Sequence, residues 1–199
     1  MTKETKWSID QTHSEIGFKV RHLMISNVKG SFGSFDASIY TTGTDFSTAN
    51  IDLWIDASSV TTGNAQRDEH MKSAEFFDVA KYPEISFTSS TIAKPDANGN
   101  HALWGELTMK GETRNLELDV QFGGITTDPW GNHKAGFSLS GKILRSEWGL
   151  TWNTVLETGG MMVSDEVFIS CEIELLKTSA NKLTMELDPK SSDGVLNEA

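Results

Sequence analysis

GELTMKGETRNLELDVQF, residues 105–122, is the stretch that decides the fold of this chain. Before Lys110 and Gly111, Leu107 and Met109 are two positions apart, and after them apolar side chains occupy every second position from Leu116 to Phe122. Polar residues fill the positions between them. A period of two is typical of a β-strand that buries one face and exposes the other. Because glycine also marks turns, the stretch predicts an antiparallel hairpin with one apolar face.

The same alternation recurs along most of the chain and predicts an all-β fold. Outside the hairpin, the apolar face is formed by Ile16, Phe18, Val20, Ile51, Leu53, Ile55, Ile85, Phe87, Phe137, Leu139, Ile143 and the odd-numbered residues from Val167 to Leu175. A less regular stretch, residues 28–40, contains Gly30 and Gly33, which indicate a bulge. The runs amount to about eight strands. An amphipathic sheet of that size must close on itself or pack against a second sheet.

One helix is predicted, over residues 64–77, where Asn64 is a favourable N-cap and charged residues surround a few apolar ones. We expect this helix to plug or cover one end of the barrel. Strand periodicity is lost near the C-terminus. This loss predicts a single barrel domain over residues 1–177 and a polar, acidic tail over residues 178–199.

The composition excludes several classes of function. The chain has 199 residues, a formal net charge of -11 and a pI near 4.8, whereas nucleic acids and anionic membrane surfaces attract clustered Lys and Arg. We therefore expect no nucleic-acid partner. The single cysteine, Cys171, excludes an intramolecular disulfide, and its place in an alternating strand predicts a buried structural thiol.

The sequence also bears on membranes and on the compartment. No stretch approaches the roughly 20 apolar residues of a membrane-spanning helix, so stable membrane insertion is not expected. The residues before Trp7 contain no apolar leader. From the sequence as given we expect a cytoplasmic protein. If a signal peptide has been removed, we expect a periplasmic one.

An eight-stranded barrel is the size at which side chains just fill the lumen or leave room for one small ligand. Five inward positions carry small residues, namely Ala37, Ser89, Gly105, Ala135 and Gly141. Two explanations remain open at this point: the close approach of another group, such as a ligand, or sharp bends that close the barrel. If a cavity exists, the residues predicted to line it are Phe18, Val20, Leu53, Ile55, Phe76, Phe77, Phe87, Leu107, Phe122, Phe137 and Leu139.

The most polar cluster beside the predicted helix contains Arg67, Asp68 and His70. Arg67 or His70 is a candidate to meet a phosphate, hydroxyl or quinone head group at the barrel mouth. Alternatively, Arg67 and Asp68 pair or cap a loop and hold the helical segment in place. The five histidines lack the close spacing of zinc sites, and the chain has no G-x-S-x-G elbow. We expect no metal, no cofactor and no catalytic residues.

Several segments resemble the YceI-like family in order and spacing, over roughly residues 7–176. They are WSIDQTHSEIGFKVRHL, VKGSFGSFDASI, IDASSVTTGNAQRDEHMKSAEFFDVAKYPEISFTSS, GELTMKGETRNLELDV and ILRSEWGL. The resemblance implies a lipocalin-like, extended antiparallel β-barrel with a hydrophobic lumen. It also implies polyisoprenoid or other amphiphilic lipid ligands, no known catalytic machinery and frequent homodimerisation. Many members of that family carry a signal peptide, which is a difference from this chain as given.

The expected function is therefore to bind an elongated apolar ligand, such as a polyisoprenoid or a prenyl quinone, for sequestration, storage or transport. One alternative is a barrel-type isomerase or cyclase, which needs a titratable group facing the lumen. The strand register points Asp165 inward but offers little else. A second alternative is a filled, dimeric structural barrel with the outward Trp54, Trp104 and Phe168 as contacts.

Overall fold

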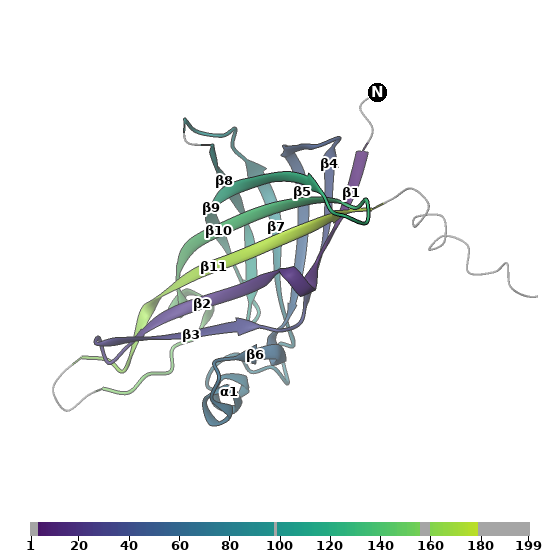
Figure 1. Ribbon diagram of the computed structural model, residues 1–199. Coiled ribbons are helices and arrows are strands. Elements are labelled where there is room, and N and C mark those ends of the chain that lie inside the picture. Colours follow the sequence, from purple (N-terminus) through teal and green to yellow (C-terminus); the bar gives the residue numbers. More distant parts are fainter. Residues whose placement is uncertain (1–3, 98, 156–159, 179–199) are drawn as a thin grey trace, which may run out of the picture.

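The computed structural model describes residues 4–97, 99–155 and 160–178, most of which form antiparallel strands (Figure 1). The strands are β1 (Glu4–Ile9), β2 (Glu15–His22), β3 (Ser26–Phe32), β4 (Phe35–Thr42), β5 (Asp45–Asp56), β6 (Val60–Thr61), β7 (Glu84–Ile92), β8 (Asn100–Met109), β9 (Glu112–Thr127), β10 (His133–Leu144) and β11 (Val163–Lys177). The helices are α1 (Ala65–Lys72) and three 3-10 turns, η1 (Gln11–His13), η2 (Ala57–Ser59) and η3 (Arg145–Trp148). In Figure 1 the long strands β10, β11 and β2 run obliquely across β5 and β7 behind them.

Eight strands close into a barrel in the order β1-β4-β5-β7-β8-β9-β10-β11, and the pairing of β1 with β11 completes the circle. β2 pairs with an earlier part of β11, so β1 and β2 act as one strand interrupted by η1. In the same way, β3 pairs with β2 and β4 pairs with β1, so β3 and β4 lie one after the other beside that interrupted strand. The predicted eight-stranded antiparallel barrel is confirmed. The N-terminal strand β1 was not predicted, because Trp7 and Ile9 are its only large apolar side chains.

The predicted bulge between residues 28 and 40 is a break between strands. β3 ends at Phe32 and β4 begins at Phe35, so the irregularity falls at Gly33 and Ser34. Gly30, by contrast, pairs regularly with Phe18, and a Cβ atom at Gly30 would lie only 2.4 Å from Cζ of the Phe18 ring. Glycine at this position therefore makes room for a neighbouring ring and is not part of a bulge.

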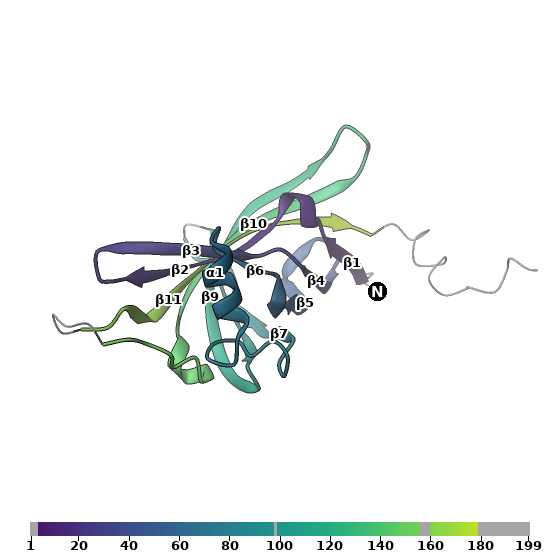
Figure 2. The ribbon, with the colours of Figure 1, turned by 90° about the horizontal axis from the view of Figure 1, so that it is seen from below.

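The helix is shorter than the sequence predicts. Asn64 is the N-cap, as expected, and its side chain accepts a hydrogen bond of 3.0 Å from the Arg67 N–H. The helix ends at Lys72, because the chain becomes extended at Ser73 and then turns so that Phe77 is buried. Figures 1 and 2 place α1 at one end of the barrel, and no described helix is long and apolar enough to cross a membrane.

Two fully buried tryptophans anchor opposite ends of the core. The Trp7 indole N–H donates to Thr41 Oγ1 at 2.9 Å, and the Trp148 indole N–H donates to the Leu107 carbonyl at 3.0 Å. A buried indole needs such an acceptor, because an unpaired N–H would lose its hydrogen bond with water. Cys171 is a buried free thiol, as predicted. Residues 179–199, most of the predicted acidic tail, lie outside the described residues; Thr178 N–H donates to the Lys6 carbonyl at 2.9 Å.

The turn between β2 and β3 has an unfavourable backbone conformation for its residues. Leu23 and Met24 have φ angles of 51° and 61°, and the Ile25 N–H donates to the His22 carbonyl at 3.2 Å. Positive φ at both central positions is the requirement of a type I′ turn, which strongly prefers Asn-Gly. Met24 is 59% exposed, so its side chain gains little packing in return.

We expect Met24→Gly to raise the free energy of unfolding by about 0.5–1 kcal/mol. Relief of the left-handed conformation is worth about 1–2 kcal/mol, and the greater freedom of glycine in the unfolded chain offsets part of it. Urea unfolding measures the change. Met24→Ala is the control, because it removes the same exposed side chain but keeps the Cβ atom. Equal stability of the two variants would contradict the explanation.

Candidate binding cavity

The barrel encloses a cavity of about 280 Å³. This volume is close to the lower end of the roughly 300–1,000 Å³ found for small-molecule sites. The cavity extends along the barrel, from Phe46 and His101 at one end to Met71 and Phe76 at the α1 end. Its walls come from the inward faces of the strands, so hydrocarbon and aromatic surface dominates throughout.

Ten of the eleven apolar residues predicted to line a cavity do so. They are Phe18, Val20, Leu53, Ile55, Phe76, Phe77, Phe87, Leu107, Phe137 and Leu139. The strand residues were found because side chains two apart on a strand face the same way. Phe76 and Phe77 follow α1 and contribute to the wall at that end. That these residues bind a ligand stays a prediction.

Phe122 is the exception, and its predicted place in the cavity wall is wrong. It has the inward phase of β9 but is 38% exposed and does not line the cavity. Its ring packs on Phe137 at 5.2 Å and on Phe46 at 5.7 Å between centroids. β9 continues to Thr127, beyond the rest of the wall, so Phe122 lies at the rim.

At the inward glycines Gly105 and Gly141 the structure shows the first of the two explanations, the close approach of another group, and that group belongs to the protein. A Cβ atom at Gly105 would lie 2.4 Å from Cζ of Phe87, and one at Gly141 would lie 2.5 Å from Cδ2 of Leu118. The groups that approach these glycines are side chains of the neighbouring strands. Each glycine therefore allows a large side chain to lie against the sheet.

Three rings gather at the α1 end of the cavity. His70 contacts Phe76 and Trp152 edge-on, with centroids 5.1 and 4.7 Å away, and Phe76 and Trp152 are 5.3 Å apart. His70 Nε2 lies 2.5 Å from Glu75 Oε2. His70 does not line the cavity. It belongs to an aromatic cluster, defined by these three rings, that lies beside the mouth.

Arg67 holds a loop, which was the second of the two explanations left open. Its Nε donates to Thr62 Oγ1 at 2.7 Å and its Nη2 to the Thr62 carbonyl at 3.1 Å. Asp68 accepts bonds from the Thr62 hydroxyl and N–H at 2.5 and 2.8 Å, which hold the pKa of that carboxyl below its usual range. The prediction that Arg67 faces a head group at the cavity is not supported, since Arg67 is absent from the cavity wall.

Arg145 lines the cavity and was missed by the sequence reasoning. It is only 5% exposed and lies at the α1 end, where η3 follows β10. Its Nε donates to the Ser164 carbonyl at 3.0 Å, and its Nη1 donates to the carbonyls of Trp152, at 2.9 Å, and Leu150. Burial lowers the pKa of this guanidinium, while the charge of Asp165 opposes the shift.

A signal for Arg145 was present in the sequence. The odd-numbered residues of β10 face inward, and Arg145 continues that phase directly after Ile143. Asp165, which the register placed inward, is instead exposed and does not line the cavity. Its carboxylate accepts hydrogen bonds from the Ser146 N–H and hydroxyl at 2.9 and 2.7 Å.

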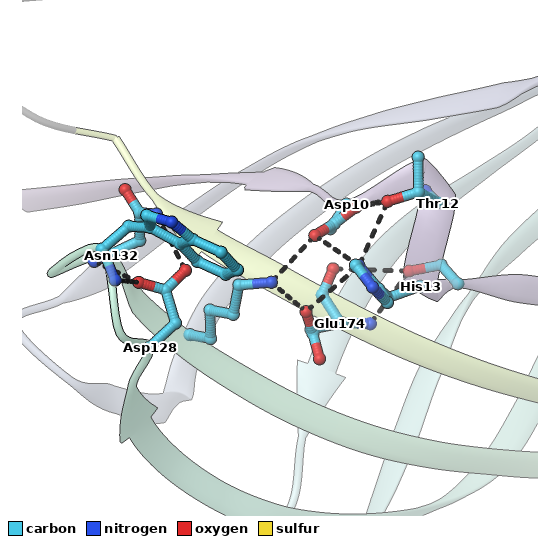
Figure 3. A network of polar contacts seen from close by, with 9 residues as sticks. Asp10, Thr12, His13, Asp128, Asn132 and Glu174 are labelled. Carbon is cyan, nitrogen blue, oxygen red and sulfur yellow. Dashed lines mark hydrogen bonds and ion pairs between the residues drawn. The ribbon is translucent and has the colours of Figure 1, made fainter.

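A polar cluster lies at the other end of the barrel, beside η1 (Figure 3). Ligand atoms of Asp10, His13 and Glu174 come within 4.8 Å of one another, the arrangement of a potential metal site. Lys134 Nζ, however, lies 3.1 Å from Asp10 Oδ2 and 2.5 Å from Glu174 Oε1. The ammonium group places one positive charge between the two carboxylates. The cluster ties η1 to β10 and β11.

Comparison with known proteins gives matches over most of the chain. Residues 7–175 match the YceI-like domain family. A UPF0312 protein of Staphylococcus epidermidis is 37% identical over 171 residues, which cover 85% of this chain and 96% of that protein. The solved structure of a Campylobacter jejuni YCEI protein is 35% identical, with a TM-score of 0.67 over 85% of this chain and 96% of that chain.

A more distant structural neighbour is a polyisoprenoid binding domain from Saccharophagus degradans. It is 16% identical to this chain and has a TM-score of 0.59, with coverage of 86% of this chain and 98% of that chain. At this identity the likeness shows a shared fold.

The close approach at Gly105 can be tested by adding one methyl group. We expect Gly105→Ala to lower the free energy of unfolding by about 1–3 kcal/mol, as overpacking does in well-packed sites. The new Cβ atom would lie 2.4 Å from both the Phe87 ring and the Thr88 carbonyl oxygen. Gly136→Ala is the matched control, because a Cβ atom there meets nothing within 4 Å. Similar unfolding midpoints for the two variants would show that the approach is unimportant.

The ion cluster at η1 predicts a dependence of stability on pH. Burial opposes the ionisation of Asp10, but hydrogen bonds from Thr12, His13 and Lys134 outweigh it and hold the pKa of Asp10 well below its usual range. A lowered pKa in the folded state stabilises the fold above the unfolded-state pKa of about 4. This stabilisation is lost as the pH falls through the folded-state value.

We therefore expect Asp10→Asn to cost about 1.5–3 kcal/mol at pH 7, the contribution of hydrogen bonds to a charged group. Relative to the original chain, the loss should shrink steadily below about pH 4. Urea unfolding from pH 2 to 7 measures it, with Asp119→Asn, an exposed carboxylate of β9, as the control. A loss that is the same at every pH would contradict a role for the charge.

Proposed function

The chain belongs to the YceI-like domain family, and from that premise we propose that it binds an elongated apolar ligand inside its barrel. A polyisoprenoid or a prenyl quinone is the ligand class we propose. The observation that carries the proposal is the cavity itself, which runs along the barrel between walls of hydrocarbon and aromatic rings. A tube of this kind fits a chain-shaped molecule better than a compact polar one.

The binding energy would come mainly from apolar surface. Each methylene group removed from water contributes about 0.8 kcal/mol before the costs of association. Among the lining residues that the structure describes, His101 and Arg145 alone have side-chain nitrogen atoms, so specific polar contacts along the wall are few. Affinity should therefore increase with the length of the apolar chain that the tube holds.

One of the structural neighbours supports the same ligand class. The Saccharophagus degradans domain, described as polyisoprenoid binding, has the same barrel fold. The likeness in sequence is low, so the support comes from the shared architecture together with the apolar wall of this chain. Sequestration, storage and transport of the lipid are all uses that such a barrel can serve.

We propose binding without chemical conversion of the ligand. His101 bonds through Nδ1 to the Ala93 carbonyl at 2.8 Å, near the start of β8, while Arg145 lies at the α1 end. Burial raises the pKa of the Cys171 thiol to about 11, which keeps it protonated near neutral pH. These three lining groups supply no paired acid and base beside one ligand bond.

Filling the cavity should abolish binding while leaving the fold intact. Ala37 and Ser38 are neighbours on β4, and Ala37 lines the cavity whereas Ser38 is exposed. We expect Ala37→Phe to weaken binding of geranylgeraniol at least tenfold, because the ring would occupy ligand space. Ser38→Phe should bind as the original chain does. Native mass spectrometry of delipidated protein, with circular dichroism to check folding, measures both.

A second, independent test of the proposed function is to extract lipid from freshly purified protein and identify it by mass spectrometry. A stoichiometric prenyl lipid is the expected result. Protein that carries no lipid and takes up neither geranylgeraniol nor ubiquinone would refute the proposed function.

A further inference from the structure

Arg145 is a buried cation in an otherwise apolar cavity. Its exposed fraction is 5%, and the residues beside it in the wall include Ile143, Leu150 and Val163. Taking a charge out of water is costly unless an opposite charge and hydrogen bonds compensate it. The position of this guanidinium therefore calls for a reason beyond packing.

The described part of the chain provides no opposite charge at contact distance. No ion pair with Arg145 occurs among residues 4–97, 99–155 and 160–178. Asp165, the carboxylate whose charge acts on Arg145, is bonded to the backbone and hydroxyl of Ser146 and not to the guanidinium. The three acceptors that Arg145 does have are neutral carbonyl oxygens.

Part of the Arg145 guanidinium is left without a hydrogen-bond acceptor among the described residues. Nε and Nη1 make the bonds to the three carbonyls, and Nη2 has no hydrogen-bond partner in the described part of the chain. Because Arg145 is part of the cavity wall, a molecule inside the cavity can approach this guanidinium. A planar guanidinium matches the geometry of carboxylate and phosphate oxygens.

We propose that Arg145 binds the anionic head group of an amphiphilic ligand, a carboxylate or a phosphate, at the α1 end of the cavity. The apolar tail then lies along the strands toward His101. This inference rests on the proposed function and makes it more specific, because it selects anionic amphiphiles over neutral alcohols of the same chain length. It moves the head-group contact from Arg67 and His70, which do not line the cavity, to Arg145.

Arg145 also has a structural part, since its carbonyl bonds connect residues 150–152 to the start of β11. A guanidinium that did only this would give no preference between head groups. The test therefore compares ligands on the unchanged protein first, which avoids any effect of a variant on folding.

Delipidated full-length protein is titrated with geranylgeranyl phosphate and with geranylgeraniol, which share one tail, and binding is measured by calorimetry. A second pair, oleate and oleyl alcohol, tests a carboxylate, and inorganic phosphate alone tests the anion without a tail. We expect each anionic lipid to bind at least tenfold more tightly than its alcohol. Inorganic phosphate alone should show no saturable binding below millimolar concentration.

The Arg145→Gln variant then assigns the preference to this side chain. We expect it to bring the affinity of geranylgeranyl phosphate down to that of geranylgeraniol and to leave the alcohol's affinity within threefold of its original value. Lys142→Gln removes a cation from the exposed side of β10, the strand that leads into Arg145. Lys142 pairs there with Glu166 at 2.8 Å, and the variant should keep the preference.

The outcomes separate the two claims. If geranylgeranyl phosphate and geranylgeraniol bind the unchanged protein with equal affinity, the inference is overturned and the proposed function still stands. A preference that survives in Arg145→Gln, or that disappears in Lys142→Gln, would also overturn it. Failure of both lipids to bind would refute the proposed function itself.

Discussion

The pairing of β1 with β11 is the contact on which the rest of the structure depends. It consists of three residue pairs, from Trp7 with Lys177 to Ile9 with Leu175, and it converts an open sheet into a barrel. Without it, two strand edges would be unpaired and the apolar face would have no partner. Two groups of side chains stabilise this pairing of β1 with β11. Trp7 is fully buried inside it, and the ion cluster of Asp10, Lys134 and Glu174 lies beside it.

Period-two alternation predicted the barrel and most of its wall, because it is a local property that each strand carries in its own sequence. It fixes which face a residue occupies but not its height along the barrel, and for this reason Phe122 was placed in the wall when it lies at the rim. The helix was predicted to be longer than it is for a different reason. Burial of Phe77 requires a turn after Lys72, and this tertiary demand overrides the local preference.

The inward glycines show how the lumen stays open. Where a strand neighbour is glycine, a ring such as that of Phe87 can lie over the neighbouring backbone, whereas a Cβ atom at Gly105 would force that ring to move. Phe18 over Gly30 and Leu118 over Gly141 repeat the arrangement. Large side chains can in this way cover the wall without filling the lumen. The sequence shows the glycines, but only the register shows which side chain lies over each.

The surface charge and the buried charge of this chain have opposite signs and act over different distances. A net charge of -11 repels an approaching anionic lipid, but at physiological salt this repulsion is largely screened beyond about 8 Å. Arg145 acts inside the barrel, where solvent ions screen much less and contact geometry decides the interaction. For the anionic ligand that we propose, the acidic surface would therefore affect how fast it arrives, whereas the guanidinium would affect how long it stays. A tube that is apolar along its length and cationic near one end would also fix the direction in which the proposed amphiphile lies.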